Sequence, residues 1–206
     1  MILYMLPAIL IGLTVHEWAH AYAAYRLGDP TARNLGRMTL NPIAHIDIFG
    51  FLCLLIAGFG WAKPVPVNPR NFKNYKRDDI IVSLAGIAMN FLVALVMTFL
   101  YVLLVKIWPE LAVNEAYQYI MTYIIVINLS LMLFNLIPIY PLDGSHVLEC
   151  LLVRKAPRFF MFMRQYGQYI LIGLLITGLL GNALSFLVTK IWAGLLWLAT
   201  SLIGLF

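Results

Sequence analysis

Long stretches of apolar residues dominate the sequence and restrict its fold more than any other feature. Hydrophobic residues make up 63% of the 206 residues and charged residues only 11%, against roughly 45–50% and 25% in soluble domains. A spanning helix needs about 20 apolar residues, so we expect an all-α polytopic membrane protein with about five to six transmembrane helices. The predicted spans are residues 2–25, 80–108, 117–139, 169–180 and 183–206.

A further apolar run, residues 46–61, is short for a span and is interrupted by glycine and alanine. Lys and Arg are frequent on both sides of it, at residues 26–47 and 63–79, as is typical of cytoplasmic loops. If both stretches are cytoplasmic, residues 46–61 form a re-entrant segment, although a full span remains open. The same rule places the connection at residues 106–116 outside, the amino terminus outside and the carboxyl terminus in the cytoplasm.

The chain is expected to form one integral-membrane domain, residues 1–206, with a motif core at about 1–147 and accessory helices at about 157–206. Its net charge of +5 comes from Lys and Arg scattered among the loops. This pattern indicates membrane topology and a lipid-bilayer environment, and it argues against nucleic-acid binding. Cys53 and Cys150 lie in unrelated segments and are expected to be free thiols.

Two connecting segments have distinctive patterns. In residues 61–69, WAKPVPVNP, the alternating prolines exclude a helix or a central strand but allow a short extended or β edge. Such an edge near a site can bind a peptide as an added strand, and Val65 and Val67 are the candidate residues. Residues 157–166 begin with Pro and mix Arg with aromatic residues, which predicts an interfacial helix.

The first apolar run contains the sequence His16-Glu17-Trp18-Ala19-His20. On a helix, His16 and His20 lie one turn apart on the same face, so both imidazoles can bind one metal ion with Glu17 beside them. Two histidines and a glutamate are unfavourable in a spanning helix unless they face a cavity, pair or bind a ligand. The pattern favours a zinc site, with an interhelical hydrogen-bond cluster as the alternative.

A tetrahedral catalytic zinc needs a third protein ligand. Asp47 and Asp143 are the two acidic residues whose positions next to apolar runs suggest a functional placement. Pro138 and Pro141 break the helix before Asp143 and free backbone groups that lipid cannot satisfy, so this segment must line protein or a cavity. Asp143 is therefore the predicted third ligand, and Asp47 is expected to be a solvated or helix-starting residue.

Four motifs together resemble the site-2 proteases, the intramembrane zinc metalloproteases, in their short prokaryotic form. They are HEWAH at residues 16–20, LNPIAHID at 40–47, GWAKPVPVNPRNF at 60–72 and FNLIPIYPLDG at 134–144. The resemblance covers most of the chain up to about residue 147. It implies that His16, His20 and Asp143 bind one zinc ion and that Glu17 is the catalytic base. It also implies a protease of the prokaryotic cytoplasmic membrane that cuts membrane proteins within or near their transmembrane segments, in regulated intramembrane proteolysis.

The resemblance extends to two asparagines. Residues 85–90 read AGIAMN, in which Ile87 stands where the family usually has proline and Asn90 matches the family's asparagine. Asn135 matches the first residue of the family pattern NxxPxxxxDG. Both asparagines are candidates for holding the substrate backbone, with ordinary interhelical hydrogen bonding as the alternative.

Two other functions fit the same pattern. One is a non-catalytic membrane protein that holds the metal as a sensor, scaffold or transporter, although transport needs further ligands and the later spans carry few. The other is a different membrane zinc peptidase, such as a prenyl-protein protease, whose third ligand would be Glu110, Glu115 or Glu149. His45 and His146 are expected to be ordinary polar loop residues, with gating, substrate contact or an extra ligand as the alternative for His45.

Overall fold

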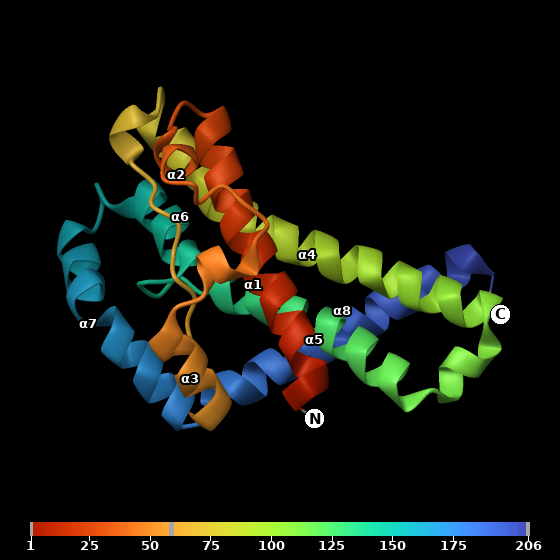
Figure 1. Cartoon of the computed structure of the whole chain (residues 1–206). Helices are drawn as coiled ribbons and strands as arrows, with labels where there is room; N and C mark the ends of the chain where they lie inside the picture. The colour runs from red at the N-terminus through yellow and green to blue at the C-terminus, as the bar shows by residue number, and fades with distance from the viewer. Residues whose placement is uncertain (1, 58–59, 205–206) are drawn as a thin grey trace.

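The computed structural model describes residues 2–57 and 60–204, and within them the chain is helical, as predicted (Figure 1). No strand is found in these ranges. The α-helices are α1 (Ile2–Arg26), α2 (Thr31–Asn34), α3 (Ile48–Ala57), α4 (Tyr75–Ile107), α5 (Glu115–Leu136), α6 (Asp143–Leu152), α7 (Pro157–Ile176) and α8 (Leu179–Ile203), and the short 3-10 helices are η1 (Pro42–His45), η2 (Pro69–Asn71) and η3 (Pro109–Val113).

Four helices, α4, α5, α7 and α8, are long and apolar enough to cross a membrane. Helix α4 has 33 residues, which is about 50 Å at 1.5 Å per residue and exceeds the roughly 30 Å hydrocarbon layer. Helix α1 has 25 residues but is not among the four, and it carries the polar HEWAH sequence. These four candidate spans are consistent with an integral membrane protein.

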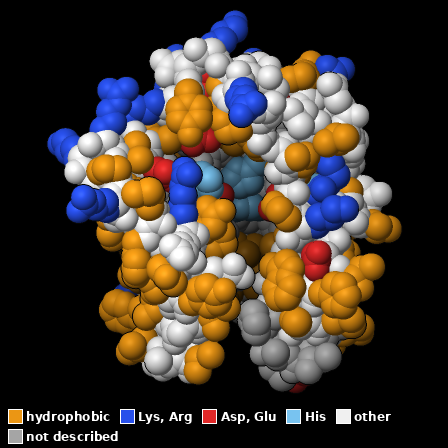
Figure 2. Space-filling view, turned by 90° about the vertical axis from the view of Figure 1, so that its left-hand side faces the viewer, with side chains coloured by type: hydrophobic (Ala, Val, Ile, Leu, Met, Phe, Trp, Pro, Cys, Tyr) orange, Lys and Arg blue, Asp and Glu red, His pale blue; other side chains and the backbone are white. Residues whose placement is uncertain are grey.

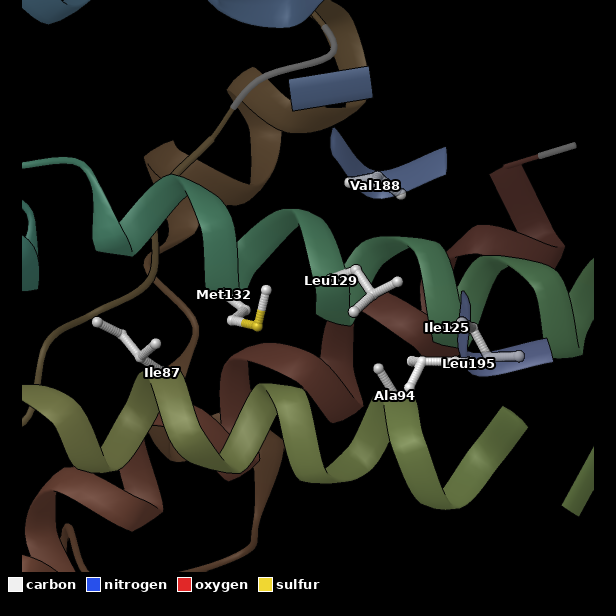
Figure 3. Packing of buried hydrophobic residues seen from close by; sticks show 7 residues of the cluster. All are labelled: Ile87, Ala94, Ile125, Leu129, Met132, Val188 and Leu195. Carbon is white, nitrogen blue, oxygen red and sulfur yellow. The ribbon is translucent and has the colours of Figure 1, made fainter. Parts of the chain in front are cut away.

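The core lies where α4, α5 and α8 meet (Figure 3). Ala94 of α4 and the α5 residues Ile125 and Leu129 are completely buried, and the small alanine allows the two helices to approach closely. Helix α1 packs against both α4 and α5 on another side. This arrangement fixes α1, which carries the predicted metal ligands. The buried cluster comprises Ile87, Ala94, Ile125, Leu129, Met132, Val188 and Leu195.

The boundaries predicted for the last helices are wrong. Residues 157–166 and the first part of 169–180 form one continuous helix, α7, and the chain turns at Gly178, whose φ is +72°. Gly167 lies inside α7 and does not break it. A Cβ at Gly167 would lie 2.7 Å from the backbone oxygen of Tyr140, so this glycine serves close packing against the loop before α6.

The segments before and after helix α3 pair with each other, so the chain enters and leaves α3 at the same place. Ile46 and Ala62 form an isolated antiparallel bridge, and the Lys63 N–H donates to the His45 oxygen at 2.9 Å. With 10 residues, α3 is about 15 Å long and too short to span the hydrocarbon layer. A short extended or β edge was expected at residues 61–69, and the extended segment that follows α3, residues 61–68, has no strand and a single bridge, at Ala62.

Predictions for single residues around α3 are confirmed. Asp47 starts the helix, because its Oδ1 accepts a hydrogen bond from the Gly50 N–H at 2.8 Å and thereby caps the first turn. Cys53 of α3 and Cys150 of α6 are both free thiols.

The far ends of α4 and α8 lie together (Figure 1). The ammonium group of Lys106 donates to the backbone oxygens of Ile203 and Gly204. The prediction placed the connection at residues 106–116 outside and the carboxyl terminus inside, and these two placements do not agree with this contact. Residues 167–206 contain one charged side chain, Lys190. The distribution of Lys and Arg could therefore not predict on which side of the membrane α8 ends.

Candidate metal centre

Three predicted metal ligands converge at one point between α1 and α6. The Nε2 atoms of His16 and His20 lie 3.0 Å apart, and Oδ2 of Asp143 lies 3.2 Å from each of them. Helix α1 brings the two histidines together through the four-residue spacing. Asp143 is the first residue of α6, directly after the proline-broken loop. Both imidazoles are buried, so the three side chains form a candidate metal site.

Hydrogen bonds fix the protonation of the His20 ring. Its Nδ1 lies 2.8 Å from the backbone oxygen of Val82. A carbonyl oxygen can only accept, so Nδ1 must carry the hydrogen. In the neutral ring this leaves a lone pair on Nε2, the atom that faces the other ligands.

The His16 ring is fixed in the same way by Asn90 of α4. Asn90 Nδ2 donates to the backbone oxygen of Gly12 at 3.0 Å and to Oδ1 of Asn128 at 2.9 Å. Its Oδ1 is therefore the atom 2.7 Å from His16 Nδ1, which must donate to it. The Nε2 of His16 also keeps its lone pair for a ligand.

The three converging atoms are all electron-pair donors. Oδ2 of Asp143 is buried and has no hydrogen-bond partner among the described residues; in the neutral rings with hydrogen on Nδ1, neither facing Nε2 carries one. The lone pairs of the two Nε2 atoms and of Oδ2 repel one another at these distances unless a cation lies among them. Two imidazole nitrogens and one carboxylate oxygen are a known donor set for catalytic zinc, which leaves a fourth position open. The residues present therefore fit a zinc ion.

Gly86 of α4 leaves the room that the two imidazoles occupy. A Cβ at this position would lie 2.6 Å from His16 Cε1 and 2.7 Å from His16 Nδ1, and it would also collide with Nε2 of His20. The prediction from sequence quoted Gly86 within a motif but gave it no role. The signal available was its position one helical turn before Asn90, on the same face of α4.

Glu17 lies beside the metal site and is 9% exposed. Its Oε2 accepts a hydrogen bond of 2.7 Å from the backbone N–H of Val65, in the extended segment. The candidate base is thus held by the segment that was predicted to bind a peptide. Nothing in the sequence pattern indicated this contact.

A cavity of about 830 Å³ opens onto the site. Figure 2 shows histidine side chains at the floor of this hollow, with hydrophobic side chains on both sides below it and Lys and Arg around its upper part. Its lining includes the metal ligands and Glu17. Both apolar and polar side chains line it, as expected of a site that binds a peptide. Among the lining residues are Leu13, Trp61, Val65, Val67, Phe134, Asn135, His146 and Glu149.

The two candidate substrate asparagines take different positions. Asn135 lines the cavity and its Nδ2 donates to the Leu131 oxygen at 3.0 Å. Asn90 is completely buried, and its amide is used by His16 and by neighbouring helices, which is the alternative weighed above. Val65 and Val67 both line the cavity.

The remaining histidines lie outside the metal site. His45 is in η1 and is buried, and its Nε2 donates to the Thr39 oxygen at 2.8 Å. It is therefore not a solvated loop residue. His146 is on α6, not in a loop, and its ring lies 6.2 Å from that of Tyr140.

No glutamate from the alternative peptidase prediction joins the metal site described for residues 2–57 and 60–204. Glu149 lines the cavity but pairs with Arg164 at 2.6 Å. Beside it, Cys150 donates to Oδ2 of Asp79 at 3.2 Å. Burial and the Asp79 carboxylate raise the pKa of Cys150 to about 12, so this thiol stays protonated and is a poor nucleophile.

The helical membrane fold and the site together define a membrane metalloprotease, and comparisons with known proteins agree. The profile of Peptidase family M50 matches residues 102–177. The chain is 40% identical over 178 residues to the "Putative zinc metalloprotease YwhC" of Bacillus subtilis, covering 85% of this chain and 81% of that protein. It is 30% identical over 173 residues to the "Putative zinc metalloprotease Rip2" of Mycolicibacterium smegmatis, covering 82% of this chain and 64% of that protein.

The chain belongs to peptidase family M50, the site-2 proteases, and is a zinc metalloprotease. This confirms the resemblance drawn from the four motifs. No solved structure gives a significant match to it.

Proposed function

We propose that the protein is an intramembrane zinc endopeptidase that hydrolyses peptide bonds within or near transmembrane segments of other membrane proteins. The position of the metal centre carries this proposal. His16 and His20 lie on an apolar helix that packs against the candidate spans α4 and α5. The site therefore lies among candidate membrane helices, where a substrate within the membrane could reach it through the cavity.

His16, His20 and Asp143 would hold one zinc ion, which when bound activates water and polarises the peptide carbonyl. Glu17 accepts the proton of the attacking water and passes it to the leaving amine. Its carboxylate lies beside the three converging ligands and is not one of them. Asn135 lines the cavity, and in this proposal its amide donates to the carbonyl oxygen as negative charge develops.

Substrate binding falls to the extended segment. A transmembrane helix hides its carbonyls in backbone hydrogen bonds, so it must unwind locally before water can attack. Val65 and Val67 line the cavity on a stretch that prolines keep extended. Strand addition to this edge would hold the unwound substrate. Replacing Val67 with Pro tests the clamp without touching the Glu17 contact, and unchanged cleavage would argue against it.

The orientation follows from the basic residues near the start of α4. Arg70, Lys73, Lys76 and Arg77 lie in or beside this end, which we place in the cytoplasm. The bridge between the segments before and after α3 supports re-entry of residues 46–61 from the same side. A reporter fused within residues 63–79 that is active outside the cell would contradict this placement.

Cleavage itself is tested with purified protein reconstituted with single-span proteins of a prokaryotic membrane. Fragments are identified by mass spectrometry. Wild type and Glu110→Gln, a matched change in η3 outside the cavity lining, should give the same fragments at the same rate, and Glu17→Gln should give them at least about 100-fold more slowly. Equal cleavage by Glu17→Gln would refute the proposed mechanism.

A further inference from the structure

The candidate catalytic base and the extended segment share a backbone hydrogen bond. The Val65 N–H donates to Oε2 of Glu17 at 2.7 Å; the Glu17 side chain is buried and Val65 is half-buried. Under the proposed function the carboxylate transfers protons and the segment binds substrate. The Val65 N–H therefore links the proton-transferring carboxylate to the substrate-binding segment.

Prolines make this N–H the single donor at the centre of the segment. Pro64 and Pro66 carry no N–H, so the backbone between Lys63 and Val67 offers only the amide of Val65. The Val65 N–H points to Glu17, and Val65 lines the cavity. A substrate strand that pairs with Val65 must use the same N–H.

The position of the segment does not depend on the Glu17 contact. On one side, the Lys63 N–H donates to the His45 oxygen at 2.9 Å, and Arg37 Nη2 donates to the Lys63 oxygen at 2.7 Å. On the other side, the Asn68 N–H donates to Oδ2 of Asp29 at 2.7 Å. Both ends are anchored, so the edge stays in place when the central amide changes its acceptor.

We propose that the Val65 N–H is a shared donor, bound to Glu17 in the free enzyme and to a substrate carbonyl when a strand is seated. The inference rests on the proposed function. Strand pairing moves the hydrogen bond from the carboxylate to the substrate, so Oε2 of Glu17 loses its backbone partner. Release of the base is thereby coupled to the seating of a peptide backbone.

Amide hydrogen exchange of the zinc-loaded full chain, resolved to single residues, tests the first half of the proposal. Val65 should exchange at least about tenfold faster in Glu17→Ala than in wild type, because alanine offers no acceptor. Glu17→Gln keeps a neutral acceptor and should lie between them. The Asn68 amide, bound to Asp29, is the internal control and should not change. Equal exchange of Val65 in wild type and Glu17→Ala would overturn the proposal.

The second half is tested by adding a leucine-based peptide hydroxamate, which chelates zinc and has an extended backbone. In Glu17→Ala, the bound probe should slow Val65 exchange at least about tenfold, because a probe carbonyl replaces the lost acceptor. Unchanged exchange with the probe bound would overturn the transfer of the donor. Failure here differs from failure of the proposed function, which is decided by cleavage and zinc retention in Glu17→Gln.

Discussion

Replacing Gly86 with Ala should disrupt zinc binding although the change adds one methyl group. The new Cβ would lie 2.6 Å from His16 Cε1, whereas ordinary van der Waals contact begins at 3.4 Å. The imidazole must therefore move by about 0.8 Å, unless α4 moves away. Zinc–ligand distances tolerate only about 0.2 Å. Because loss of outer-shell support alone costs about 10–100-fold in metal affinity, we expect a loss of at least about 100-fold.

Two opposing effects on folding make the same substitution informative. Alanine is better than glycine in a helix interior by about 1 kcal/mol, whereas overpacking costs about 1–3 kcal/mol. Gly194→Ala on α8 is the matched control, since its Cβ would meet nothing within 4 Å. Zinc affinity is measured by competition with a chromophoric chelator, and stability by thermal unfolding. Wild-type zinc affinity in Gly86→Ala would refute the steric reasoning.

Three further changes test other parts of the site. Glu17→Gln should retain zinc but reduce the cleavage rate by about 10²–10⁴-fold, measured on reconstituted substrate. Asn90→Leu should lower zinc affinity by about 10–100-fold in the chelator assay, because it removes the acceptor that orients His16. Burial raises the pKa of Asp29, but hydrogen bonds from Thr31 and the extended segment outweigh it and hold the pKa below the ordinary 3.8. Its stabilisation should therefore be present above about pH 4 and be lost as pH falls further, so melting curves of Asp29→Asn should change less between pH 5 and pH 3 than those of wild type.

The helices and the metal ligands could be predicted because each depends on a local pattern. Apolar runs of spanning length require helices, and the four-residue spacing of His16 and His20 places both on one face. Asp143 was found because prolines expose the backbone just before it. These signals do not depend on how the helices pack.

The supporting groups could not be predicted because they depend on which helices meet. Asn90 was given the same role as Asn135, and only the packing of α4 against α1 and α5 turns it toward His16. The contact between Val65 and Glu17 joins residues 48 positions apart. The start of α7 was misplaced, at residue 169 instead of Pro157: Gly167 does not break the helix and serves close packing against Tyr140.

The central claim, a zinc site built from His16, His20 and Asp143, is tested most directly by the metal content of purified, detergent-solubilised protein. Wild type and Glu17→Gln should each contain about one zinc per chain, because Glu17 is not a ligand. His16→Ala and Asp143→Ala should contain much less. Folded wild type that binds no zinc after the metal is supplied, or full zinc content in Asp143→Ala, would contradict the account.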